Sequence, residues 1–227
     1  MKLYYYATES ALSALWDQEI KVASPCDFND PFEFLPSTEN VTPENRTFCH
    51  AFQGSSRHHY YVLSMSERPN NIRMWAQYAA NHTGLMIELN WDVGIFKELS
   101  AGGALRKVDY ENPKRVVIDP SNLSDKDILE VLTRKGNDWA QEQEWRLIFT
   151  SDFLERIGGR HKLLNGQVAA FIPLRDECVS RVTVGHRSSS ILFDSIEAIK
   201  RNRQAKWPIA KAKLSDYEFL LIDEQSA

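Results

Sequence analysis

Short, separated apolar segments constrain this chain more than any other feature of its sequence. Runs of about four to seven branched and aromatic residues recur along the 227 residues, and most are bounded by Pro, Gly, Asn or Ser, which is typical of β-strands. Fewer segments have helical spacing, and the two kinds follow one another in irregular order. The pattern predicts an α+β fold, with a single mixed or antiparallel sheet and helices packed on it.

No repeat, low-complexity tract or Pro/Gly-rich linker divides the chain, so we expect a single α+β domain over residues 1–227. The stretch Cys26–Gln53 contains several prolines and many Asn, Ser and Thr, and it is expected to be mostly loop. A helix is expected at Ile72–Asn81. The expected strands are Leu3–Tyr6, Ile20–Ala23, Tyr60–Met65, Leu85–Leu89, Ala104–Tyr110, Gln143–Phe149, Val168–Ile172, Val179–Val184, Ile209–Leu214 and Tyr217–Ile222.

Composition narrows the class of protein and its location. Hydrophobic residues make up 43% and aromatic residues 11%, which is too apolar for a disordered chain. A net charge of −4 excludes histone-like binding of nucleic acid, although it allows a local basic patch. The three cysteines lack disulfide spacing, and neither a signal peptide nor a membrane span is apparent. We therefore expect a cytoplasmic protein without a membrane partner, and no pattern indicates its oligomeric state.

The segment around Glu142, Glu144 and Arg146 is the strongest candidate for chemistry. In a strand, these alternate residues lie on one face, where two carboxylates repel each other unless a cation lies between or opposite them. A buried face of this kind would bind a cation, ribose hydroxyls or a developing positive charge. An edge strand with its charges in water explains the same pattern.

Two further segments could complete a polar pocket. In the loop Phe28–Glu33, Asn29 and Asp30 form a polar turn between aromatic anchors, although a plain structural turn would look the same. The strand end bearing Ser64 and Ser66 is followed by a helix with aromatic side chains, which are either core residues or a platform for stacking a ligand. Those aromatic residues are Trp75 and Tyr78.

Several chemistries lack their signatures. The chain has no HExxH motif and no CxxC pair, so a zinc site is not expected. The sequence also lacks a G-x-S-x-G elbow. The segment Gly185–Ser190 could place backbone N–H groups at the start of a helix, which is a weak signal for anion binding that helix capping explains equally well.

Taken together, the chain resembles the uncharacterised bacterial family numbered 2971 among the domains of unknown function. The matching features span most of the sequence in order. They are Leu3–Tyr6 with Leu12 and Leu15; Phe28–Glu33; Ser64-x-Ser66; Met74–Ala79 with His82 and Gly84; Lys107-Val108-x-Tyr110; Lys135 with Trp139; and Glu142-x-Glu144-Trp145-Arg146. The family has no assigned function, although a role in bacterial stress or phage defence would suit it.

A more distant resemblance is to ADP-ribosyltransferases of the His–Tyr–Glu type. It implies that Tyr6 or Thr8 holds the nicotinamide ribose, that Trp75 or Tyr78 stacks on the ring, and that Glu144 is catalytic. The chain departs from the family pattern, because Tyr replaces the expected His and Ala replaces the expected Gly in the first motif. An ion pair between Arg146 and Glu144 would also neutralise the catalytic carboxylate.

The favoured interpretation is a protein that handles a nucleotide-type ligand, most concretely by NAD-dependent ADP-ribosyl transfer or NAD glycohydrolysis. Glu144 would stabilise the ribosyl cation, and Glu142 would orient the ribose or the acceptor. Arg146 or Arg73 would bind the pyrophosphate through paired hydrogen bonds. NAD would be a substrate rather than a resident cofactor, and the acceptor would be a protein or a nucleic acid.

Two other classes of function remain open. A non-catalytic sensing or interaction module would use a basic cluster to bind nucleic acid, and that cluster comprises Lys200, Arg201, Arg203, Lys206, Lys211 and Lys213. A solvated helix end explains the same residues. A metal-dependent nuclease would need four carboxylates to converge within a few ångströms, namely Asp30, Glu33, Glu142 and Glu144.

Overall fold

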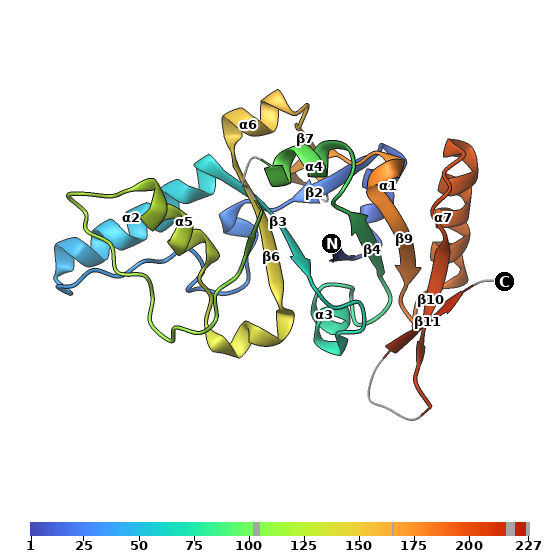
Figure 1. The fold of residues 1–227 in the computed structure, drawn as a ribbon, viewed down its shortest axis with the longest axis horizontal. Coiled ribbons are helices and arrows are strands. Elements are labelled where there is room, and N and C mark those ends of the chain that lie inside the picture. Colours follow the sequence, from blue (N-terminus) through green and yellow to red (C-terminus); the bar gives the residue numbers. More distant parts are fainter. Residues whose placement is uncertain (102–104, 165, 217–220, 226–227) are drawn as a thin grey trace. The chain divides into compact units, whose positions relative to one another are not determined.

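A computed structural model describes residues 1–101, 105–164, 166–216 and 221–225. Strands and helices are intermixed, the larger sheet is mixed, and a smaller sheet accompanies it, which confirms the predicted α+β class. The chain divides into two compact units, each assembled from separate segments (Figure 1). Unit 1 comprises residues 1–21, 65–103 and 171–227, and unit 2 comprises residues 22–64 and 104–170. The expectation of a single domain stays a prediction.

Unit 1 is built on a run of neighbouring strands in the order β11-β10-β9-β4-β1. Strand β1 pairs antiparallel with β4, β4 pairs antiparallel with β9, and β9 pairs parallel with β10, which makes this sheet mixed. Its elements are β1 (Lys2–Ala7), α1 (Ala11–Trp16), α3 (Ile72–Gln77), β4 (Leu85–Asn90), α4 (Gly94–Ala101), η3 (Asp176–Cys178), β9 (Val179–Val184), α7 (Ser190–Arg203), β10 (Ile209–Leu214) and β11 (Leu221–Gln225).

Unit 2 contains the neighbouring strands β3, β6 and β5, with β5 antiparallel to β6. Its elements are η1 (Pro25–Asp27), α2 (Pro43–His59), β5 (Leu105–Lys107), α5 (Asp125–Thr133), η2 (Asn137–Glu142), β6 (Glu144–Thr150), α6 (Ser151–Arg156) and β7 (Arg160–Leu164). Three strands have residues in both units, and these are β2 (Glu19–Val22), β3 (Tyr60–Ser66) and β8 (Gln167–Pro173). Strands β2, β8 and β7 form the smaller sheet.

Each unit has its own apolar core. In unit 1, Trp75 of α3 packs among residues of β1 and β4, including Tyr6 and Met86. In unit 2, helices α2 and α5 lie side by side in Figure 1, and Phe52 of α2 and Leu132 of α5 share one core cluster. The second core positions the candidate site, because α5 and β6 both carry residues of that site at their ends.

Helix α2 corrects the expectation of a mostly irregular segment from Cys26 to Gln53. The Thr42 hydroxyl accepts a hydrogen bond from the Asn45 N–H, and Pro43 is the first helical residue. Proline suits that position, because its missing N–H would have no partner in the first turn of a helix. Helix α3 ends at Gln77, earlier than predicted. The last expected strand, Tyr217–Ile222, lies largely outside the described residues.

Candidate functional site

A pocket of about 690 Å³ opens in unit 2. The loop after η1 supplies one wall, the segment at residues 112–117 supplies another, and the end of α5 with the start of η2 supplies a third. A volume in this range suits a small organic ligand. All the residues that line this pocket belong to unit 2.

A buried cluster of five charged side chains lies at one end of this pocket. The Lys135 ammonium is 3.1 Å from a carboxylate oxygen of Glu33, 2.6 Å from one of Glu142 and 3.3 Å from one of Glu144. Arg146 donates hydrogen bonds to Glu144 at 2.8 and 3.0 Å and to Glu33 at 2.8 and 3.0 Å. All five residues are at least nine-tenths buried. Glu144 and Arg146 therefore share a buried, ion-paired face of β6, as predicted, whereas Glu142 joins the cluster from η2 rather than from the strand.

Opposite charges in the cluster stabilise the ionised forms of Glu144, Lys135 and Arg146. Burial alone would raise the pKa of Glu144, but Arg146 and Lys135 outweigh this effect and lower it to about 2. Burial would likewise lower the pKa of Lys135 and Arg146, yet the neighbouring carboxylates raise both. The cluster carries three carboxylates and two cations, so its formal charge is −1.

Hydrogen bonds from neighbouring elements fix the loop that carries Asp30 and Glu33. The Asp30 carboxylate accepts the N–H of Phe32 at 2.9 Å, which is the local turn that an Asp before a proline favours. The side-chain amide of Gln53, from α2, donates to the carbonyls of Pro31 and Glu33 at 3.1 and 2.8 Å. Helix α2 therefore holds the loop that presents Glu33 to Lys135 and Arg146.

Backbone geometry brings the remaining cluster members together. Gln143 adopts a left-handed conformation with φ of 45°, which ends η2 and redirects the chain into β6 between Glu142 and Glu144. The N–H of Lys135 donates to the Asp109 carbonyl at 3.1 Å just after α5 ends. The Tyr110 hydroxyl accepts the N–H of Glu144 at 3.1 Å, and burial raises the pKa of that hydroxyl.

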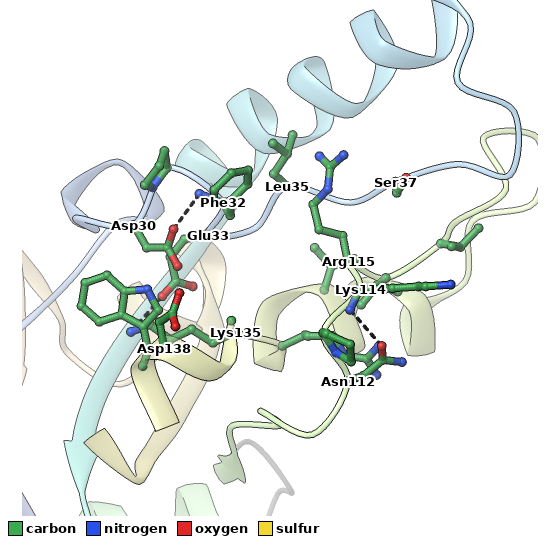
Figure 2. Close-up of a pocket in the computed structure, with 18 residues that line it drawn as sticks. Asp30, Phe32, Glu33, Leu35, Ser37, Asn112, Lys114, Arg115, Lys135 and Asp138 are labelled. Carbon is green, nitrogen blue, oxygen red and sulfur yellow. Dashed lines mark hydrogen bonds and ion pairs between the residues drawn. The ribbon is translucent and has the colours of Figure 1, made fainter. Parts of the chain in front are cut away.

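The pocket has an acidic end and a basic end. Figure 2 shows Asp30, Glu33 and Asp138 gathered with Lys135 on one side, while Lys114 and Arg115 lie on the other. Lys114 and Arg115 are exposed, and Arg115 donates to the carbonyl of Pro36 at 3.3 Å. A ligand with a negatively charged group would therefore find exposed cationic donors at the basic end.

Two aromatic side chains line the same pocket. Phe32 is 64% exposed, which leaves its ring accessible to a ligand in the pocket. Trp139 is half-buried, and the Lys135 ammonium lies 4.7 Å from the centre of its ring. Both rings line the pocket, with Lys135 already against Trp139, whereas the sequence had pointed to Trp75 or Tyr78 for stacking.

Six of the predicted site residues belong to unit 1, and the others belong to unit 2. Trp75 is 1% exposed, meets Tyr6 edge to face at 5.4 Å and donates its indole N–H to the Pro69 carbonyl. Its environment is that of a core residue. Ser66 is fully buried, whereas Arg73 and Thr8 are exposed and Tyr78 packs against the core cluster of unit 1.

The other predicted residues belong to unit 2 and lie in or beside the cluster. Asp30 lines the pocket, and Asn29 is exposed next to it. Ser64 contributes to lowering the pKa of Glu144. Sequence reasoning did not assign a ligand role to the pocket residues Lys114 and Arg115, and the only available signal was their position beside Pro113 in a polar loop.

The alternative functions gain little from this geometry. Glu33, Glu142 and Glu144 do converge, as a nuclease would require, but the Lys135 ammonium holds the position between them. In the described part of the chain, no group of three or more His, Cys, Asp or Glu side chains is arranged so that it could hold a metal ion. Of the basic cluster proposed for nucleic acid, Arg203 is mostly buried and paired with Asp176 at 2.6 Å.

Comparison with known proteins finds a family match for one segment of the chain. Residues 74–147 match the model of a family described as a protein of unknown function, DUF2971, which confirms the predicted resemblance over that segment. It includes Lys135, Glu142, Glu144 and Arg146 of the buried cluster. The comparisons find no match to the chain among curated proteins or solved structures. Among the described residues, no helix is both long and apolar enough to cross a membrane.

Proposed function

We propose that this protein binds a nucleotide-type ligand in the pocket of unit 2. The observation that carries this proposal is the composition of the pocket wall, which offers each kind of contact that a nucleotide needs. Aromatic faces suit a base, cations suit phosphate, and carboxylates suit ribose hydroxyls. The wall supplies these contacts through Phe32, Trp139, Lys114, Arg115, Asp30 and Glu33.

The basic end of the pocket takes the phosphate role in this proposal. Arg146 was the sequence-based candidate, but its guanidinium is fully buried and donates to Glu33, Glu144 and the Leu132 carbonyl. Arg115 and Lys114 are exposed and line the pocket, so their donors are accessible to a ligand. Arginine can form two parallel hydrogen bonds to a phosphate, which makes Arg115 the main candidate.

NAD is the nucleotide that we propose first, with cleavage of its bond between ribose and nicotinamide. In this step the bonding electron pair leaves with the nicotinamide nitrogen, and the ribose carbon becomes an oxocarbenium-like cation. A fixed carboxylate stabilises that cation until water attacks it and loses a proton, or until an acceptor nucleophile takes the place of water. The buried cluster supplies carboxylates for this purpose, and Arg146 and Lys135 lower the pKa of one of them, Glu144, to about 2.

Glu33 and Glu144 have different places in this mechanism. Glu33 lines the pocket, and we assign it to stabilise the ribosyl cation while Arg146 and Lys135 hold its carboxylate in place. Glu144, the catalytic candidate from the sequence, forms ion pairs with Lys135 and Arg146. We assign it as a positioning residue that holds these two cations, and through them Glu33, in place. Glu142 forms an ion pair with Lys135, so we assign it as a positioning residue too.

Isothermal titration with NAD, paired with an assay for released nicotinamide, tests the proposal. Wild type should bind and release, and Arg115→Ala should weaken binding about tenfold because it loses a charged hydrogen bond to phosphate. Arg46→Ala removes an exposed arginine of α2 away from the pocket wall, and it should behave as wild type. Glu33→Gln should retain binding and lose release.

Each other outcome has a definite meaning. If Glu33→Gln retains release while a folded Glu144→Gln loses it, the catalytic assignment returns to Glu144. Binding without release by wild type supports a nucleotide sensor. Absence of both overturns the proposal for NAD, and salt-dependent binding of DNA or RNA would then favour the nucleic-acid module.

A further inference from the structure

The Asp30 carboxylate has no cationic partner among the described residues. Its side chain is buried, with 7% of the residue exposed, and it lines the pocket. One hydrogen bond reaches its carboxylate, from the N–H of Phe32 at 2.9 Å, and no described cation forms an ion pair with it. A buried carboxylate without a cation is costly, so such a group facing a cavity suggests a positively charged ligand.

The neighbouring cations are already committed. Lys135 lies between Glu33, Glu142 and Glu144, and Arg146 is shared between Glu33 and Glu144, which leaves the cluster at a formal charge of −1. Asp30 and the exposed Asp138 add two more carboxylates to the cluster. This end of the pocket then has five carboxylates and two cations, which gives a formal charge of −3. The field at this end of the pocket therefore favours a cation.

The aromatic lining of the same end favours a planar cation. Trp139 and Phe32 line the pocket together with Asp30 and Asp138. Aromatic rings attract cations through their π-face, and the attraction strengthens where water is excluded. A flat, positively charged ring can contact an aromatic face and a carboxylate at once, whereas a neutral ring gains only the stacking contact.

We propose that the acidic end of this pocket selects a positively charged ring, with Asp30 as its counter-ion. This inference rests on the proposed function and deepens it, because the oxidised nicotinamide ring of NAD⁺ is a planar cation and the reduced ring of NADH is neutral. The dinucleotide would lie with its pyrophosphate toward Arg115 and its pyridinium toward Asp30. The site therefore distinguishes the two oxidation states of one cofactor skeleton by charge.

Titration with two matched pairs of probes tests the proposal. The first pair is NADH and a non-cleavable carbocyclic NAD⁺ analogue, so that turnover does not disturb the measurement. The second is 1-methylnicotinamide, a cation, and neutral nicotinamide, followed by ligand-observed NMR. Wild type should prefer the cation of each pair about tenfold. Asp30→Asn keeps the oxygen that accepts the Phe32 N–H, so it should fold, and it should bring both ratios close to one.

The outcomes separate this inference from the proposed function. Equal affinities within both pairs, or a preference that persists in Asp30→Asn, overturn the role of Asp30. Failure of both dinucleotides to bind overturns NAD as the ligand, and the inference then stands only if 1-methylnicotinamide binds and Asp30→Asn abolishes that binding. As a matched control, Asp152→Asn changes a carboxylate of α6 that does not line the pocket, and it should leave both ratios unchanged.

Discussion

Replacing Arg146 with methionine should destabilise the protein far more than replacing an ordinary surface arginine. The change removes four hydrogen bonds to carboxylates and one to the Leu132 carbonyl, and it leaves three buried carboxylates around the single ammonium of Lys135. Breaking a buried ion pair in this way costs about 3–5 kcal/mol. That is a large part of the roughly 5–15 kcal/mol by which a folded domain is stable.

Arg134 provides a matched comparison in the same unit. It pairs with Glu130 at 2.6 Å and Asp109 at 3.1 Å, but both carboxylates are about 40% exposed. Water screens such pairs, so Arg134→Met should cost no more than about 1 kcal/mol. Urea denaturation followed by circular dichroism gives the free energy of unfolding for wild type and both variants.

Two results decide this prediction. A loss in Arg146→Met that is no larger than the loss in Arg134→Met would refute the account of a tightly coupled buried cluster. If Arg146→Met is too unstable to purify, the double variant Arg146→Met/Glu33→Gln should recover part of the stability, because it removes a carboxylate that has lost its partner. Absence of any recovery would show that the loss arises from packing rather than from charge.

Other predictions concern pH and backbone space. The pKa of Glu144 is about 2 in the folded protein, whereas its ordinary value is 4.5. This difference stabilises the folded protein above pH 4.5, and about 3 kcal/mol of that stability should be lost as the pH falls toward 2. Urea midpoints that stay constant over this pH range would contradict the prediction. Burial, aided by Arg187, lowers the pKa of His82 and His186. The unfolded chain therefore takes up protons first, and the stability of the folded protein should fall as the pH drops below about 6.5. If the stability of His186→Gln falls equally over this pH range, the prediction is wrong. Gly185→Ala places a Cβ 2.0 Å from the His82 carbonyl oxygen, so it should lower the thermal midpoint of unfolding. The Cβ added by Gly54→Ala in α2 meets nothing within 4 Å, so this change should raise the midpoint. Shifts of the same sign in the two variants would contradict this packing.

Strand positions followed well from the sequence because their signal is local. Val179–Val184 forms β9 with the predicted bounds, and Leu3–Tyr6 and Leu85–Leu89 lie within β1 and β4. Branched and aromatic residues in short runs are decided by their immediate neighbours. Helix α2 was missed because prolines were taken to mean loop, although Pro43 after the Thr42 cap is a signal that begins a helix.

The candidate site was predictable only in part. Strand spacing accounts for the shared face of Glu144 and Arg146, whereas Glu142 lies in η2 and joins them through the left-handed turn at Gln143. Glu33 lies 113 residues before Arg146, and no local pattern could pair them. Trp75 illustrates the opposite error, since its helical spacing fits both a core residue and a stacking platform. Only its packing against Tyr6 assigns it to the core.

A crystal structure of the protein with the carbocyclic NAD⁺ analogue would test the central claim most directly. The account predicts ligand density in the pocket of unit 2, with the pyrophosphate at Arg115 and the pyridinium between Trp139 and Asp30. Density bound elsewhere, for example beside Arg73 in unit 1, or a ligand whose phosphates approach Asp30, would contradict it.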